Sequence, residues 1–217
     1  MRKIVLGFLF ALAAAALFSQ EVIIREINGT VEVKEPDAAA WSPARQGQRI
    51  ARTAAVSTGF KSTAILELGN SVLTVQPLTR LTVEEIQESA GNERVSLNLQ
   101  TGRIRADVKP PAGGRTEFTV RSPTATASVR GTSFEFNGIQ LRVDEGRVHL
   151  SGGDQSGVYV GAGHLVQTDI ENGRTVSVAE ALREELAPSL PAGMDSVPDI
   201  KAAPVTDGIL EAGFDWL

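Results

Sequence analysis

Cysteine is absent from the 217 residues of this chain. Its absence excludes disulfides, thiolate metal sites, cysteine nucleophiles and the lipid-anchored cysteine of bacterial lipoproteins. Histidine is almost as scarce, because only His149 and His164 are present. The sequence also lacks an H-E-x-x-H zinc motif, a G-x-S-x-G motif and a phosphate-binding loop. We therefore expect no enzymatic activity, no bound metal and no cofactor, and a fold held by its core and its hydrogen-bonded strands.

Aromatic residues are few, at 5% of the chain, so platforms for stacking a sugar ring are scarce. Trp41 is the best candidate for such a platform, although a Trp that closes a first β unit is more often a core residue. Positive charge is also in deficit, since the formal net charge is -5. An acidic chain without a basic stripe argues against nucleic acid as a partner. We expect neither nucleic acid nor a small-molecule ligand.

Only one long hydrophobic run is present, and it lies at the start of the chain. Met1-Arg2-Lys3 is basic, the apolar run covers Ile4 to Leu17, and Phe18-Ser19-Gln20 ends it. The run is shorter than the about 20 residues that span a bilayer comfortably. Residues 1–20 therefore predict a cleavable secretory signal peptide. An uncleaved anchor is the alternative, because the cleavage site is not a clean A-x-A. Both interpretations place the rest of the chain across a membrane, in the periplasm or outside the cell.

Beyond the signal, apolar and polar residues mostly alternate, and Gly-containing dipeptides interrupt the alternation. The chain has 21 glycines and is rich in Val, Ile and Thr, which is typical of hairpin-rich β proteins. The pattern predicts a mainly β fold. We expect antiparallel hairpins in a sandwich-like or roll-like all-β domain over residues 21–176.

The apolar faces of each expected hairpin can be tested against its turn. In a two-residue hairpin the turn fixes which residues pair, so the apolar faces of both strands must coincide. Four turns pass this test: Asn137-Gly138 (Phe136 with Ile139, Phe134 with Leu141), Glu145-Gly146 (Val143 with Val148, Leu141 with Leu150), Thr101-Gly102 (Leu99 with Ile104, Leu97 with Ala106) and Gly69-Asn70 (Leu66 with Leu73, Ala64 with Val75). The first two predict a three-stranded meander over residues 132–150, with Arg142 on its outer face.

The alternation changes parity at Arg130-Gly131-Thr132. Apolar residues are odd-numbered from Ala125 to Val129 and even-numbered from Phe134 onward. A single extra residue in a strand causes such a change, and Gly tolerates the backbone angles that it requires. We therefore expect a β-bulge or sharp bend at Gly131. Either the bend directs Arg130 at a partner or a buried acid, or it only turns the strand between two sheets.

The character of the chain changes after residue 176. Ser177 and Glu180 fit a capping box, apolar residues follow at helical spacing, and Pro188 ends the pattern. Residues 177–188 therefore predict a short helix. Residues 189–217 predict a Pro-rich linker followed by an apolar C-terminal tip that contains Trp216. The tip is either a strap docked on the β domain or a peptide for another protein.

An ordered set of segments resembles the FecR-like periplasmic domain. The set spans most of Gly29 to Leu150: Gly29-Thr30-Val31-Glu32-Val33, Trp41, Gly47-Gln48-Arg49-Ile50, Val56-Ser57-Thr58-Gly59, Ala64-Ile65-Leu66-Glu67-Leu68-Gly69-Asn70-Ser71, Phe118-Thr119-Val120-Arg121-Ser122-Pro123-Thr124-Ala125, Val129-Arg130-Gly131-Thr132-Ser133-Phe134 and Val143-Asp144-Glu145-Gly146-Arg147-Val148. The resemblance implies an all-β periplasmic domain. In the best-known members, this domain transmits a signal from an outer-membrane receptor to an anti-sigma segment inside the cell.

This chain departs from that plan, since the apolar run stands at its start and no receptor-binding domain is recognisable after Leu150. We expect an exported envelope module that binds other proteins and regulates or signals without catalysis. It would act through strand edges, the 109–115 loop or the C-terminal tip. A structural or glycan-associated role at the cell wall is the alternative. The candidate structural or interaction residues are Arg130, Gly131, Thr132, Arg142 and Trp216.

Overall fold

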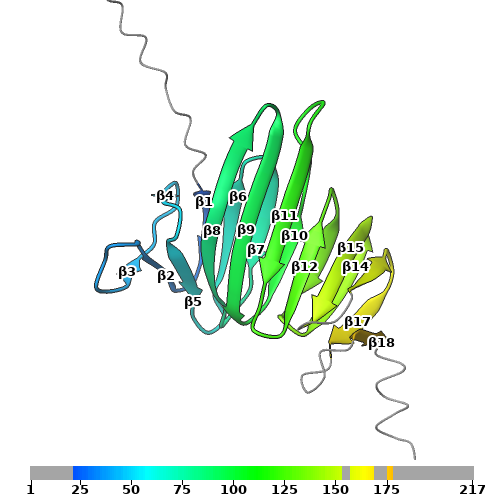
Figure 1. Ribbon diagram of the computed structural model, residues 1–217. Helices are drawn as coiled ribbons and strands as arrows, with labels where there is room; N and C mark the ends of the chain where they lie inside the picture. The colour runs from blue at the N-terminus through cyan, green and yellow to red at the C-terminus, as the bar shows by residue number, and fades with distance from the viewer. Residues whose placement is uncertain (1–21, 153–156, 169–174, 178–217) are drawn as a thin grey trace, which may run out of the picture.

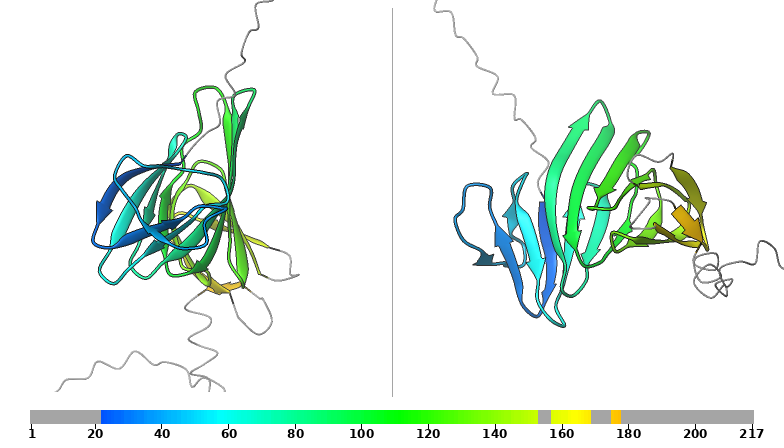
Figure 2. Two further views of the ribbon diagram at one scale, coloured as in Figure 1. Left: turned by 90° about the vertical axis from the view of Figure 1, so that its left-hand side faces the viewer. Right: turned by 60° about the horizontal axis from the view of Figure 1, so that its bottom comes forward.

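The computed structural model describes residues 22–152, 157–168 and 175–177, and all the regular structure in these ranges is β-strand. The strands form two sheets that lie face to face, as the views in Figures 1 and 2 show. The prediction of a mainly β fold is thereby confirmed. The predicted helix lies outside the described residues apart from Ser177, and the linker and apolar tip lie wholly outside them.

Sheet A contains nine strands within the described residues. In spatial order they are β4 (Arg49–Ile50), β1 (Val22–Asn28), β6 (Thr63–Leu68), β7 (Ser71–Val75), β10 (Ile104–Asp107), β13 (Ser133–Phe136), β14 (Gln140–Glu145), β17 (Leu165–Thr168) and β18 (Thr175–Ser177).

Sheet B also contains nine strands in the described ranges. In spatial order they are β3 (Ser42–Pro43), β2 (Val31–Lys34), β5 (Ala55–Thr58), β8 (Arg80–Ser89), β9 (Asn92–Thr101), β11 (Arg115–Arg121), β12 (Ala125–Val129), β15 (Arg147–Gly152) and β16 (Val158–Gly161).

The chain builds both sheets together from one end to the other. It adds β6 and β7 to sheet A, β8 and β9 to sheet B, β10 to sheet A, β11 and β12 to sheet B, and then β13 and β14 to sheet A. In Figure 1 the colour accordingly runs from blue at one side of the molecule to yellow at the other. Each strand therefore pairs with strands that are close to it in the sequence.

The core lies between the two sheets, and the alternation in the sequence explains it. In β6 and β7 every second residue is buried, including Leu66 and Leu73, and its neighbours are partly exposed. Phe118 of sheet B meets Phe134 of sheet A edge to face, with ring centroids 6.3 Å apart. Full burial of such a side chain contributes about 1.5–3 kcal/mol. The apolar faces predicted from the sequence are thus the faces that form the core.

The predicted turns fared differently in detail. The hairpin at Gly69-Asn70 is confirmed, since Leu66 pairs with Leu73 and Ala64 pairs with Val75. Strands β9 and β11 depart from the expected antiparallel pairing, because they pair in parallel. The reason is that the chain crosses to sheet A through β10 before it returns, so β11 enters sheet B in the same direction as β9.

The hairpin around Asn137-Gly138 exists, but its predicted register was wrong by two residues. Phe136 pairs with Leu141 rather than with Ile139. The Asn137 side chain explains the shift, because its Oδ1 accepts hydrogen bonds from the backbone N–H groups of Ile139 (3.0 Å) and Gln140 (2.7 Å). Gly138, with φ +93°, is therefore the first of the two central turn residues, the position that Gly occupies in a type II′ turn. A shift of two leaves every side chain on its predicted face.

The turns at Thr101-Gly102 and Glu145-Gly146 are not hairpins, and the predicted meander over residues 132–150 was wrong. Gly102 joins β9 of sheet B to β10 of sheet A, and Gly146 joins β14 of sheet A to β15 of sheet B. Two strands that face each other across a core bury the same positions as two strands paired within one sheet. The alternation of apolar residues therefore could not distinguish a hairpin from a corner.

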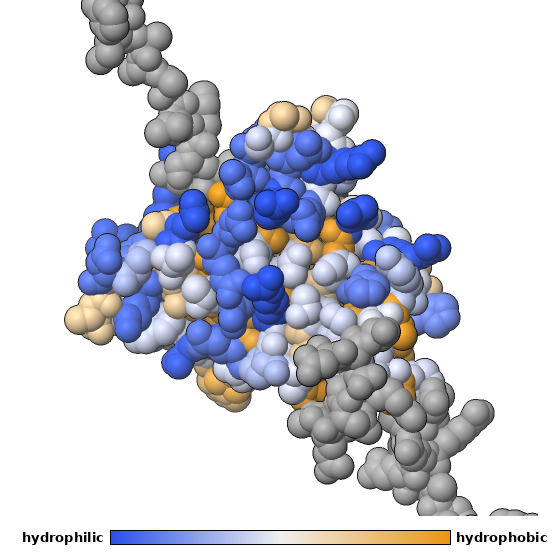
Figure 3. Space-filling model, viewed as in Figure 1, coloured by the Kyte–Doolittle hydropathy of each residue, from blue (hydrophilic) through white to orange (hydrophobic). Residues whose placement is uncertain are grey.

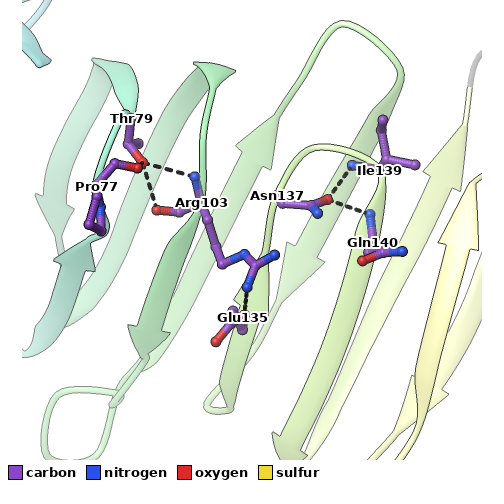
Figure 4. A network of polar contacts seen from close by, with 7 residues as sticks. All are labelled: Pro77, Thr79, Arg103, Glu135, Asn137, Ile139 and Gln140. Carbon is purple, nitrogen blue, oxygen red and sulfur yellow. Dashed lines mark hydrogen bonds and ion pairs between the residues drawn. The ribbon is translucent and has the colours of Figure 1, made fainter. Parts of the chain in front are cut away.

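Corner glycines have a shared structural role. Gly29, Gly102 and Gly146 all have positive φ, and an added Cβ at each would overlap a small hydroxyl residue, which is Ser62, Thr79 or Thr132 respectively. Two of these hydroxyls also accept a hydrogen bond from the residue after the glycine. Ser62 Oγ accepts from the N–H of Thr30 at 2.8 Å, and Thr79 Oγ1 accepts from the N–H of Arg103 at 2.9 Å (Figure 4). At each of these corners, where the chain passes from one sheet to the other, the glycine therefore packs closely against the hydroxyl residue.

Candidate interaction site

The sharp bend predicted at Gly131 is confirmed. Gly131 has φ +65° and lies between β12 of sheet B and β13 of sheet A, so the bend turns the chain between the two sheets. The register of β13 against β14 also shifts between Ser133 and Phe134. Thr132 is buried at this corner, and its Oγ1 has no hydrogen-bond partner among the described residues.

Arg130 is exposed at the end of β12, and within the described residues it forms no ion pair. The side chain lines two cavities of about 560 and 260 Å³, and Glu117 lines both as well. We call these two cavities, which share Arg130 and Glu117, the arginine groove. Strongly hydrophilic residues cover this end of sheet B, toward the top of the space-filling view (Figure 3).

A row of charged side chains crosses sheet B along the groove. Arg94 of β9 is the partner of Glu117 of β11, and the two side chains form an ion pair of 3.1 Å. Phe118 pairs with Val129, and Val129 pairs with Val148. One residue beyond these pairs, Arg130 follows β12 between Glu117 on one side and Arg147 of β15 on the other. Neighbouring strands lie roughly 5 Å apart, so two arginines adjoin in this row.

The smaller cavity has an aromatic wall beside these arginines. The rings of His149 and Tyr159 lie 4.8 Å apart at 57°, and the Arg147 guanidinium lies 6.0 Å from the centroid of Tyr159. The His149 ring also lies over Gly157, where a Cβ would overlap it. Tyr159 nevertheless remains 73% exposed. Aromatic side chains that are open to solvent are enriched at binding surfaces.

The larger cavity contains a buried carboxyl group. Glu93 is 2% exposed, and its oxygens lie 3.3 Å from the backbone N of Asn70 and 3.2 Å from Thr116 Oγ1. Burial raises the pKa of Glu93 above its usual range, and the nearby Glu88 adds to this, while the hydrogen bonds from Asn70 and Thr116 oppose it. Arg115 lines the same cavity and has no ion pair within the described residues.

The remaining predicted residues lie elsewhere. Arg142 is exposed on the outer face of β14, as the sequence predicted, and its partner on β13 is Glu135. It lines a different cavity of about 250 Å³ with Arg103. That cavity adjoins the polar network of Figure 4, where Arg103 and Glu135 form an ion pair of 3.1 Å. Trp216 lies outside the described residues. Trp41 is half-buried, and the Arg80 guanidinium lies over its ring, 5.1 Å from the ring centroid.

Of the groove residues, the sequence analysis selected Arg130 and, as the end of the 109–115 loop, Arg115, but it missed Arg147 and Tyr159. Arg147 was placed in a meander beside β14, and that error hid its position next to Arg130. The usable signal was the pairing of β12 with β15, which a corner at Gly146 makes possible. Tyr159 is the single tyrosine of the chain, and nothing in its local sequence marks it as exposed.

No group of three or more His, Cys, Asp or Glu side chains in the described part of the chain is placed to hold a metal ion. Within the same ranges, no helix has the length and apolar character of a membrane span.

Comparisons with known proteins identify the central part of the chain. Residues 54–154 match the family model described as "FecR protein". Two solved structures of "a putative anti-sigma factor from Parabacteroides distasonis ATCC 8503" are similar, each with 17% identity and a TM-score of 0.46. The likeness covers 56% of this chain and 57% of those chains, so this chain spans little more than half of their length. A comparison with curated proteins gave no match.

Proposed function

Because residues 54–154 are a FecR domain, we propose that the chain is an exported envelope protein that binds other proteins and regulates or signals without catalysis. The family match is the observation that carries this proposal, and it covers most of the strands of both sheets. The basic, apolar start of the chain supports export, since a charged segment followed by a short apolar run is the pattern of a secretory signal.

The outer surface of sheet B supports binding as the mode of action. An exposed arginine without an ion pair in the described residues and an exposed tyrosine flank one cavity, and Arg and Tyr are enriched where protein interfaces gain most of their affinity. The proposed partners are proteins of the same envelope.

Affinity capture tests this proposal. The full chain, expressed with a C-terminal tag in its own cells, is recovered from solubilised envelopes, and its companions are identified by mass spectrometry. The expected result is a small, reproducible set of envelope proteins that is missing when a tagged but unrelated exported protein is used. Recovery of the protein with purified cell wall, and of no protein partner, would favour a glycan-associated role in its place.

A further inference from the structure

The charge balance of the arginine groove is the starting point. Five charged side chains line it at the surface, and two of them, Arg94 and Glu117, already neutralise each other. Arg115, Arg130 and Arg147 have no ion pair among the described residues. The groove therefore carries excess positive charge on a protein whose overall net charge is -5.

Two nearby acids, Glu93 and Asp144, do not correct this imbalance. Glu93 lines the larger cavity, but it is buried and its oxygens are directed at Asn70 and Thr116. Asp144, close to Arg147 in the sequence, forms an ion pair of 2.8 Å with Arg105 of sheet A. Like charges on adjoining strand positions destabilise a sheet. The Arg130–Arg147 pair therefore favours an anionic group that lies between the two guanidinium groups.

We infer that the arginine groove is the docking site for an acidic peptide segment of a protein partner. One carboxylate of the segment lies between Arg130 and Arg147, since guanidinium groups bind carboxylates through paired hydrogen bonds. A neighbouring side chain packs on the exposed ring of Tyr159, and a second carboxylate reaches Arg115 in the larger cavity. This inference rests on the proposed function, because it names the part of the surface that would hold the partner.

The lining of the smaller cavity favours a peptide over other anionic polymers. An aromatic wall of His149 and Tyr159 stands directly beside the two arginines. A peptide segment can offer an apolar side chain next to a carboxylate, so it uses both parts of the cavity. A carboxylated polysaccharide or an anionic bilayer would engage the arginines chiefly through charge.

A binding titration tests the inference. The probe is a fluorescein-labelled hexaglutamate peptide with one central leucine, and its anisotropy is measured against the full-length protein at low ionic strength. We expect R130E and R147E each to weaken binding by about tenfold or more, which is the usual effect of losing an arginine anchor. Y159A weakens binding as well. Arg52 is exposed and lies outside the groove, so R52E serves as the matched change in charge.

The outcomes separate the possibilities. Equal losses for R52E and R130E would show a non-specific charge effect and overturn the inference. Binding of polygalacturonate or of phosphatidylglycerol vesicles without binding of the peptide would also overturn it. Circular dichroism checks that each variant is folded, and R147Q replaces R147E if the charge reversal disturbs the sheet. If envelope proteins are captured equally by wild type and R130E, the groove assignment fails while the proposed function stands. If no envelope protein is captured, the proposed function itself fails.

Discussion

At the scale of single residues, Glu93 joins three parts of the molecule. Its carboxyl group contacts the backbone of Asn70 in the β6–β7 turn and the hydroxyl of Thr116 in β11. Thr116 Oγ1 also lies 3.3 Å from the carbonyl oxygen of Lys109, at the start of the 109–115 loop. A hydroxyl has one proton to donate. The Thr116 hydroxyl donates to a Glu93 oxygen and can also direct its proton at the carbonyl oxygen of Lys109, so Glu93 and Lys109 share this one donor.

The raised pKa of Glu93 makes stability depend on pH. The folded protein binds the Glu93 proton more tightly than the unfolded chain does. Below the ordinary pKa of a glutamate, the carboxyl group is protonated in both states and does not lower the free energy of unfolding. The free energy of unfolding then falls as the pH rises through the raised pKa. Glu93→Gln keeps an acceptor oxygen for the backbone N–H of Asn70 and removes the charge. We expect the variant to match wild type at acidic pH and to exceed its free energy of unfolding at neutral pH. Urea titrations at both pH values measure this difference.

A wild-type advantage for Glu93 at neutral pH would contradict this account. Glu88→Gln is the companion change, because Glu88 adds to the rise in the pKa of Glu93. With that neighbouring charge removed, the loss of stability toward neutral pH becomes smaller but does not vanish.

The corner glycine Gly102 permits a second test at the residue scale, with Gly91 of the β8–β9 turn as its control. Gly91 and Gly102 have φ values of +76° and +90°, but a Cβ at Gly91 would meet open space, whereas one at Gly102 would overlap Thr79. We expect Gly91→Ala to cost about 1–2 kcal/mol, for the left-handed backbone alone. Gly102→Ala costs ~1–3 kcal/mol more, because the crossing is overpacked. Thermal or urea unfolding compares the two, and equal losses would mean that close packing at the corner is unimportant.

At the scale of elements, β14 shows which features the sequence determines. Leu141 is fully buried on one face, and Arg142 is exposed on the other. Leu141→Ala should cost about 2–5 kcal/mol through the cavity that it leaves. Arg142→Ala should change the free energy of unfolding by no more than about 0.5 kcal/mol. The two values come from urea titrations of otherwise identical proteins, and similar losses for both would place the wrong face of β14 against the core.

The buried and exposed faces of the strands could be predicted because apolar and polar residues alternate along each strand. The neighbours of the strands could not, because the same alternation serves a hairpin and a corner equally well. Gly69-Asn70 is a true hairpin, whereas Glu145-Gly146 leads from sheet A to sheet B. The bend at Gly131 was found because a change of parity is a local signal.

The sequence does not report which strands pair, and this decided which residues of the candidate site could be predicted. Arg130 could be selected because it adjoins the bend. Arg147 and Tyr159 reach the same cavity only through the pairing of β12 with β15 and of β15 with β16. These contacts link residues on different strands, and no periodicity within one strand reports them.

At the scale of the whole molecule, the first prediction concerns export. The basic residues Arg2 and Lys3 and the apolar run that follows predict removal of the first twenty residues. We expect the protein purified from the envelope to begin near Gln20 or Glu21. Intact-mass analysis provides the measurement, and recovery of the full precursor mass would contradict cleavage.

The alternation of the chain between its two sheets has a consequence for how the protein can be assembled. Because each new pair of strands is added beside strands that precede it closely, no early strand must wait for the last one to find its partner. The entropy lost in closing a loop grows only slowly with its length, so the intervals between paired strands add little to this cost. A chain that emerges N-terminus first, from a ribosome or through a membrane pore, can therefore fold vectorially. At each stage the newest strands would form the growing edge of both sheets, while β4 and β3 would already form the opposite edge.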